Sequence, residues 1–479
     1  MSELDAVVIG SGPNGLAAAV RLAERGQKVL VVEARATIGG GLRTSALTLP
    51  GFVHDECSAV HTLGILSPYL RTLPLEAHGL RWLQLAASVA HPLDDGPAVL
   101  LRGTIDDTTA QFAADARAYR RLVAPFLADP HGLLADALAP LGWPRHPLQL
   151  ARFGWRGMRS ARGLARRFAT REARALLAGC AGHSVLPLER MFTGAIALMF
   201  LVTGHVEAWP VAAGGSAAIA EALASLLRAH GGQIETGTPI RALAELPPAK
   251  AYLFDTDPRQ LASIAEPVLP TRYVRRLRRY RFGPGAFKLD WALGGPIPWR
   301  DPRCLEATTL HVGGTFEEIA ASEAAAARGD HSDRPFLIVC QQSQADPTRA
   351  PAGQHTGYAY CHVPAGSTVD QTAAIEQQIE RFAPGFRERI LARHVTTPAD
   401  LEAKNPNYVG GAITGGMADI GQLFTRPVAR WNPYTTPHRR IFLCSASTPP
   451  GGGVHGMCGY HAAETVLARI ERLPRTPLA

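Results

Sequence analysis

The chain has 479 residues, of which 46% are hydrophobic and 19% are charged. These globular values exclude wholesale disorder, a coiled coil and collagen, and the length predicts two or more domains. The net charge is +8, and the chain has 45 arginines but only 4 lysines. GC-rich coding explains this preference for arginine more simply than a nucleic-acid-binding surface does. The basic residues are not interleaved with stacking aromatic residues, so we expect no nucleic-acid partner.

The first elements in chain order form a βαβ unit. Apolar residues predict a strand over 5–9, a turn over 10–15, a helix over 16–25 and a second strand over 28–33. From about residue 86 to 205 the chain is expected to be helical and rich in arginine. An α/β pattern resumes with a helix over 217–229, a turn and strand over 231–240, and a strand over 251–255.

The C-terminal half predicts strands over 286–292, 336–340 and 441–444, with helices over 316–328, 371–382 and 457–472. The fold class is therefore α/β, with a Rossmann-type domain, an α+β substrate domain and inserted helices. We expect a discontinuous nucleotide-binding domain (1–85, 206–285 and 420–479), a helical substrate- or membrane-facing insertion (86–205) and a substrate domain with a sheet and helices (286–419).

A dinucleotide-binding fingerprint occupies the first βαβ unit. Gly10, Gly12 and Gly15 lie between the predicted strand and helix, and Glu33 ends the next strand. Gly10 permits the tight turn, Gly12 lets backbone approach a pyrophosphate, and Gly15 lets helix pack on strand. Glu33 is the expected acceptor for a ribose diol. A second glycine segment, Gly39-Gly-Gly41, follows with Arg35 and Arg43, and this extension favours FAD over NAD.

The chain resembles phytoene desaturase-like FAD-dependent oxidoreductases of the amine oxidase superfamily. The resemblance rests on the glycine doublet with Arg43, on 209–216 and 232–237 in the middle, and on Asn407-Tyr-Val-Gly-Gly and 443–463 near the C-terminus. Within that superfamily it is similar to the pyridine nucleotide-disulfide oxidoreductase domain-containing protein 2 group.

The resemblance implies a set of FAD contacts. The last helix would also direct its N-terminal dipole at the reduced flavin. The implied cofactor-binding residues are Gly10, Gly12, Pro13, Asn14, Gly15, Glu33, Ala34, Arg35, Gly40, Gly41, Arg43, Ile240, Gly453, Val454, His455, Gly456 and Met457.

Three residues are candidates for proton transfer or substrate contact: His61, His455 and Lys288. Alternatively, His61 and His455 are structural histidines hydrogen-bonded to backbone, and Lys288 forms an ion pair with Asp290. Asp419 either closes the site or caps a helix. Cys458 is expected to be an inert buried thiol, so no covalent flavin attachment is inferred.

Several activities are disfavoured by missing motifs. The seven cysteines form no C-x-x-C pair, which excludes the disulfide reductase mechanism and favours a reducing cytoplasm. No second dinucleotide motif, metal-ligand motif or secretion signal is seen. We therefore expect no metal, and reoxidation by O2 or a quinone.

The expected function is dehydrogenation or desaturation of an apolar, isoprenoid- or carotenoid-like substrate by hydride transfer to flavin N5. Amine oxidation and a non-redox prenyl-group carrier of the same fold are the alternatives. The arginines of 152–174, together with the apolar run 191–202, suggest peripheral association with the inner membrane surface. A solvated helix face would explain the arginines equally well, a buried helix would explain the apolar run, and a subunit interface would explain both. The sequence leaves the oligomeric state open.

Overall fold

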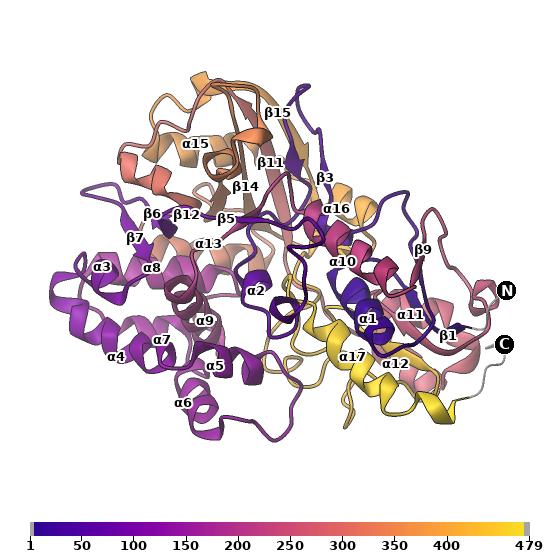
Figure 1. Ribbon diagram of the computed structural model, residues 1–479. Helices are drawn as coiled ribbons and strands as arrows, with labels where there is room; N and C mark the ends of the chain where they lie inside the picture. Colours follow the sequence, from indigo (N-terminus) through magenta and orange to yellow (C-terminus); the bar gives the residue numbers. More distant parts are fainter. Residues whose placement is uncertain (1–3, 474–479) are drawn as a thin grey trace.

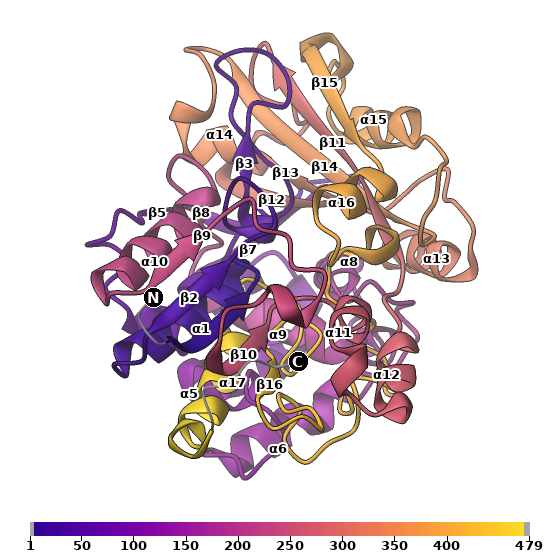
Figure 2. The ribbon, with the colours of Figure 1, turned by 90° about the vertical axis from the view of Figure 1, so that its right-hand side faces the viewer.

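The computed structural model describes residues 4–473, so the outermost residues of the predicted segments 1–85 and 420–479 lie outside it. Two β-sheets and a group of helices make up the described chain (Figure 1). Figure 2 shows the seven-stranded sheet above, and the five-stranded sheet with its helices below.

The five-stranded sheet is parallel and contains the N-terminal βαβ unit. Its strand order is β16 (Ile441–Leu443), β10 (Ala249–Phe254), β1 (Leu4–Ile9), β2 (Val29–Val32) and β9 (Gln233–Glu235). The three inner strands, β10, β1 and β2, are almost completely buried, as strands covered on both faces should be. The predicted α/β class and Rossmann-type domain are confirmed.

Three helices cover one face of this sheet and bring the two ends of the chain together. Helix α1 (Pro13–Glu24) packs against α10 (Ala217–Ala229) and the C-terminal α17 (Met457–Leu467). A Cβ atom at Gly459 of α17 would lie 1.8 Å from the backbone oxygen of Asn14 in α1. The close approach of these two helices therefore requires glycine.

The seven-stranded sheet is mixed and lies beside the nucleotide-type sheet. Its order is β15 (Ile390–Thr396), β11 (Gly285–Leu293), β14 (His355–Val363), β13 (Leu337–Cys340), β12 (Ala307–Val312), β6 (Ala87–His91) and β7 (Val99–Arg102). The expectation of helix from residue 86 onward is wrong at its start, because β6 and β7 extend this sheet. In sequence, a short apolar run can belong to a buried strand or to a buried helix. Only the strands with which β6 and β7 pair distinguish between these possibilities.

Helices surround the two sheets. The helical group at the lower left of Figure 1 contains α3 (Ile105–Thr109), α4 (Ala116–Leu127), α5 (Pro130–Ala137), α6 (Pro147–Gly157), α7 (Ala161–Ala165), α8 (Arg171–Gly182) and α9 (Thr193–Val206). The others are α2 (Thr62–Ile65), α11 (Pro258–Ile264), α12 (Thr271–Arg278), α13 (Phe316–Arg328), α14 (Gln342–Ala345), α15 (Thr372–Phe382) and α16 (Pro398–Lys404). Two short strand pairs complete the fold: β3 (Thr44–Ser45) with β4 (His54–Asp55), and β5 (Trp82–Leu83) with β8 (Val211–Ala212).

Most of the apolar run 191–202 belongs to α9, in which Ala197, Leu198, Leu201 and Val202 are fully buried. Of the alternatives for this run, the structure therefore supports a buried helix. Within residues 4–473, no helix is both long and apolar enough to cross a membrane.

A buried charged cluster connects elements that are far apart in sequence. Arg349 is fully buried and pairs with Asp55 at 3.0 Å and with Asp346 at 2.9 Å. Lys288 donates both to the Asp55 backbone oxygen, at 3.0 Å, and to Asp290. Removing one member of such a cluster leaves a buried charge uncompensated, so these residues lock β4 to the seven-stranded sheet.

Candidate functional site

The glycine-rich turn between β1 and α1 is packed so closely that side chains are excluded. A Cβ atom at Gly15 would lie 2.1 Å from the Gly10 backbone oxygen, and one at Gly12 would lie 2.7 Å from Asp255 Oδ2. Gly10 itself has φ +102°, a conformation that favours glycine. In the first turn of α1, Pro13 has no N–H and the Gly15 N–H is bound by Asp255, so the Asn14 backbone N–H is the one left for an anion.

Glu33 lies at the C-terminal end of β2 beside this turn. Its Oε2 accepts hydrogen bonds from the backbone N–H of Ser11 at 2.9 Å and from Ser11 Oγ at 2.6 Å. Its Oε1 accepts from the Arg35 backbone N–H at 2.9 Å and pairs with Arg43 at 3.3 Å. These contacts hold a carboxylate at the place where the fingerprint requires one.

Asp255 was not recognised as a site residue from the sequence. It directly follows β10, which lies next to β1 in the sheet, and its Oδ2 accepts a hydrogen bond from the Gly15 backbone N–H at 2.9 Å. Burial raises the pKa of its carboxyl well above the usual value, and the charge of nearby Glu33 adds to the effect. An acidic residue at the carboxyl end of a strand beside β1 is the signal that could have identified it.

The second glycine segment approaches a tyrosine that the sequence analysis did not assign. A Cβ atom at Gly41 would lie 2.0 Å from the hydroxyl oxygen of Tyr408, and one at Gly40 would lie 3.1 Å from the Gly12 Cα atom. Tyr408 belongs to the segment that carried the resemblance. The two glycine segments therefore lie against each other, with Tyr408 closing one side.

The C-terminal glycine loop meets the N-terminal motif. Gly456, with φ +68°, begins α17, and a Cβ atom there would lie 2.8 Å from the Ala17 side chain. Ser67 Oγ donates to the His455 backbone oxygen at 2.6 Å, and the His455 imidazole Nδ1 accepts from the Met457 backbone N–H at 3.0 Å. The loop is thus held by one of its own side chains, His455, and by Ser67 from the N-terminal part of the chain.

A cavity of about 580 Å³ is lined by these segments. Its charged lining residues come from the glycine-rich end and the middle: Glu33, Arg35, Arg43, Asp255, Asp257, Lys404 and Arg426. The other end, which we call the inner chamber, is lined by uncharged side chains: His183, Ser184, Ile196, Met199, Phe200, Trp209, Thr309, Ile338, Cys340, Tyr358 and Tyr360. The chamber lies between α9 and the β12–β14 part of the seven-stranded sheet.

Most of the residues predicted to bind the cofactor line this cavity. They are Gly10, Gly12, Pro13, Asn14, Glu33, Ala34, Arg35, Gly40, Gly41, Arg43, Ile240, Gly453 and Val454. Gly15, His455, Gly456 and Met457 do not line it and pack behind its wall. Ile240 was expected on a strand, but β9 ends at Glu235 and Ile240 follows in a loop.

The three residues predicted to act in catalysis do not line the cavity. His61 pairs with Ser216 Oγ at 2.8 Å, and burial lowers the pKa of both His61 and His455 to about 4. Lys288 is paired with Asp290, as one interpretation expected, and its Nζ lies 4.4 Å from the centre of the Tyr358 ring. Their roles in catalysis stay predictions.

Two further expectations concern single side chains. Asp419 forms a two-point ion pair with Arg281 at 2.7 Å, which is neither of the roles considered for it. Cys458 is a fully buried free thiol whose Sγ lies 3.5 Å from the Thr448 backbone oxygen, in agreement with the expected buried thiol. Within residues 4–473, no group of three or more histidine, cysteine or acidic side chains could hold a metal ion.

Comparisons with known proteins extend over nearly the whole chain. A model of the NAD(P)-binding Rossmann-like domain matches residues 8–73. Pyridine nucleotide-disulfide oxidoreductase domain-containing protein 2 of Rattus norvegicus is 28% identical over 98% of this chain and 94% of its own length. The neurosporene-forming phytoene desaturase of Rhodobacter capsulatus is 25% identical over 99% of this chain and 95% of its own length.

Among solved structures, a putrescine oxidase with bound putrescine aligns with a TM-score of 0.62. The alignment covers 98% of this chain and 99% of that one at 18% identity, so it shows that the two chains share a fold. The resemblance inferred from the motifs is confirmed, as are the predicted enzyme class and FAD as the cofactor. The chain is thus an FAD-type oxidoreductase that is similar, over nearly its whole length, to a phytoene desaturase in sequence and to an amine oxidase in fold.

Proposed function

We propose that this enzyme dehydrogenates an apolar, isoprenoid- or carotenoid-like substrate, with noncovalently bound FAD accepting a hydride. The observation that carries the proposal is the lining of the cavity along the glycine segments. One end offers the N-terminus of α1, Glu33 and two arginines, and the other is an uncharged chamber with aromatic and aliphatic walls. This combination suits a dinucleotide at one end and an apolar molecule at the other.

The residues present fit FAD. The N-terminus of α1, with the Asn14 backbone N–H, would face the pyrophosphate, Glu33 would accept from the ribose, and Arg43 would offset phosphate charge. The glycines at 40, 41 and 453 leave room for an extended ligand to pass close to backbone. Bound FAD would supply a hydride acceptor, while the chain orients the substrate and excludes water.

The proposal assigns cofactor binding and substrate binding to different predicted segments. The cofactor is held by 1–85, 206–285 and 420–479, and the substrate is held by 286–419 and the helical insertion 86–205. The chamber supports this assignment, because all of its lining except Trp209 comes from segments 86–205 and 286–419: from α9 and the residues after α8 on one side, and from β12, β13 and β14 on the other.

The test is an anaerobic bleaching screen on flavin-loaded protein. Polyprenes, carotenoids, amines and fatty acyl compounds are added separately, and absorbance near ~450 nm follows reduction of the flavin. Bleaching by polyprenes or carotenoids alone supports the proposal. Bleaching by amines alone replaces it with amine oxidation, and protein purified without flavin would favour the non-redox carrier.

Amine oxidation is the second candidate, because Trp209, Tyr358 and Tyr360 give the chamber aromatic walls that suit a cation. The chamber also has no acidic lining residue among those the structure describes, and a protonated amine buried there would lack a counter-charge. Apolar substrates are therefore favoured over amines.

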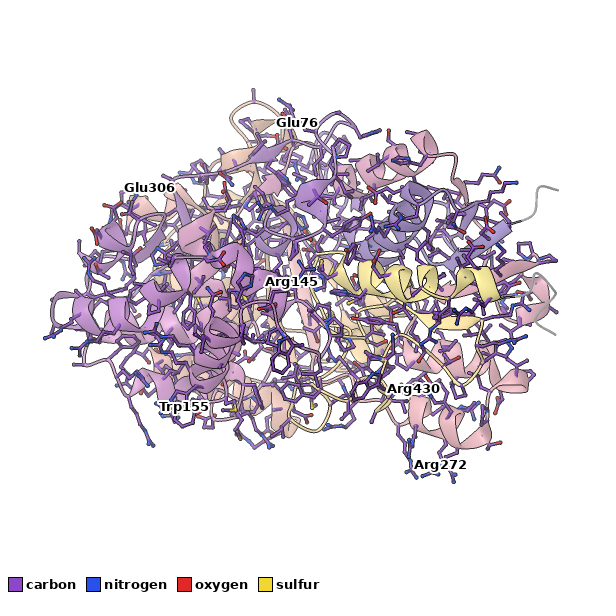
Figure 3. All side chains as sticks on the ribbon, turned by 60° about the horizontal axis from the view of Figure 1, so that its bottom comes forward. Glu76, Arg145, Trp155, Arg272, Glu306 and Arg430 are labelled. Atoms are coloured by element: carbon purple, nitrogen blue, oxygen red, sulfur yellow. The ribbon has the colours of Figure 1, made fainter. Side chains whose placement is uncertain are left out.

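Peripheral membrane association is part of the proposal. Exposed Trp143 and Trp431 line a second cavity that shares Phe153 and other wall residues with the first, and α6, which also lines that cavity, exposes Leu148 and Trp155. Arg145, Trp155 and Arg430 are labelled in Figure 3, which views the molecule from below. Aromatic side chains flanked by arginine suit an anionic lipid surface.

Co-sedimentation with anionic and neutral liposomes at low and high salt tests this association. We expect salt-sensitive binding to anionic liposomes, because exposed charges are screened within about a Debye length. Equal, negligible sedimentation in all four conditions would contradict the membrane association. A stable dimer without liposome binding would instead identify the exposed aromatic surface as a subunit interface.

A further inference from the structure

The inner chamber is apolar but not free of polar atoms. Among the described residues, His183 is the only histidine that lines the cavity. It follows the C-terminal end of α8, and its ring lies 4.5 Å from Phe200 and 5.6 Å from Trp209, measured between ring centres. A polar group placed among aromatic walls requires a partner, or it costs free energy.

One nitrogen of His183 is already used. Its Nε2 lies 2.8 Å from Nε2 of His311, which is fully buried. Burial lowers the pKa of His183 to about 3 and that of His311 well below its usual value, so both imidazoles are neutral at neutral pH. Between two neutral rings, one Nε2 carries a hydrogen and the other accepts it.

The surroundings of His311 select the tautomer. Its Nδ1 has no hydrogen-bond partner within residues 4–473 and faces Gly179, where a Cβ atom would lie 2.4 Å away. An N–H group orphaned in that position is the rarer arrangement in proteins, so His311 Nδ1 keeps its lone pair and Nε2 carries the hydrogen. His183 Nε2 then accepts, and His183 Nδ1 carries an N–H.

Two other polar atoms of the chamber lining also lack partners in the described part of the chain. They are Oγ of Ser184 and Nε1 of Trp209, and both residues are more than nine-tenths buried. The indole nitrogen is a donor only, and the hydroxyl can donate or accept. Buried polar atoms are almost always hydrogen-bonded, so the chamber is prepared for a ligand with a hydrogen-bond acceptor.

We propose that the inner chamber binds an apolar molecule through one neutral oxygen acceptor, a carbonyl or hydroxyl, with His183 Nδ1–H as the donor. A carboxylate is disfavoured, because the cavity's lining cations, Arg35, Arg43, Lys404 and Arg426, lie outside the chamber. An ammonium is disfavoured for lack of a carboxylate. The inference rests on the proposed function and narrows its substrate class from a bare hydrocarbon to an oxygenated one.

A matched set of ten-carbon probes tests the inference: decane, 2-decanone, 2-decanol, decanoate and decylamine. Calorimetric titration into flavin-loaded protein gives each dissociation constant without requiring turnover. We expect 2-decanone and 2-decanol to bind about two- to tenfold more tightly than decane, which is the range for one net hydrogen bond. Decanoate and decylamine should bind no more tightly than decane.

Variants assign the effect to the imidazole. His183→Phe should bring 2-decanone to the level of decane, whereas His183→Gln, which keeps an N–H donor, should retain part of the difference. Met199→Leu is the matched control, because it changes an apolar wall residue and should leave the difference intact. His183→Leu replaces His183→Phe if the larger ring prevents folding, as judged by flavin retention and melting.

The inference is overturned if wild-type protein binds decane and 2-decanone equally, if nothing binds, or if the difference survives in His183→Phe or His183→Leu. Tighter binding of decanoate or decylamine overturns it as well. Failure of the proposed function is recognised separately, because it would appear as protein without flavin or as flavin that no apolar compound bleaches.

Discussion

Replacing Gly15 with alanine tests the close packing of the glycine turn. The added Cβ atom would lie 2.1 Å from the Gly10 backbone oxygen and 2.9 Å from Asp255 Oδ2. Ordinary contact needs about 3.5 Å, so the helix must move away from the turn. Overpacking of this kind costs about 1–3 kcal/mol, against about 1 kcal/mol gained by placing alanine in a helix.

A second glycine inside a helix provides the control. Gly154 lies within α6, and a Cβ atom there would meet nothing within 4 Å. Gly154→Ala should therefore raise the unfolding midpoint, whereas Gly15→Ala should lower it and reduce flavin retention. The measurements are denaturant unfolding followed by circular dichroism, and the ratio of flavin to protein absorbance after dialysis. Equal effects of the two substitutions on both measurements would refute the reasoning.

Three further predictions concern charged groups. Glu33→Arg should weaken FAD binding by about 1.5–3 kcal/mol, the range for hydrogen bonds to a charged group, and unchanged flavin retention after dialysis would contradict the assignment. Because the raised pKa of Asp255 means that the folded protein holds a proton more tightly than the unfolded chain, stability should fall as pH rises from about 4 toward the folded pKa. Asp255→Asn should flatten that slope in chemical unfolding of the flavin-free protein, and an unchanged slope would rule Asp255 out. Arg349→Met should cost about 3–5 kcal/mol in unfolding free energy by stranding two buried aspartates, while Arg334→Met, at an exposed ion pair, should cost less than about 1 kcal/mol; similar losses would argue against the buried cluster.

The cofactor end of the site could be predicted because its determinants are local. Gly10, Gly12, Gly15 and Glu33 stand at fixed spacings within one βαβ unit, and the secondary structure follows from short apolar runs. Asp255 could not be assigned in this way, because its role arises only when β10 pairs beside β1.

The substrate end was harder to predict for the same reason. His183 and Tyr360 come from α8 and β14, and neither lies in a recognisable motif. His61 and His455 were chosen because they adjoin motifs, yet neighbours in sequence need not face the same cavity. Strands β6 and β7 were missed because a short apolar run does not reveal its pairing partners.

The contact between Gly459 and Asn14 joins two segments of the chain that are synthesised at very different times. Residues 9–43 of the cavity lining are synthesised long before residues 445–454 and before α17, the helix that packs against α1. Since domains fold as their segments emerge, the nascent chain holds an incomplete nucleotide site until these later segments have been made. We therefore expect stable capture of the cofactor to come late, and a chain that stops before α17 should not retain FAD even though every N-terminal glycine is present.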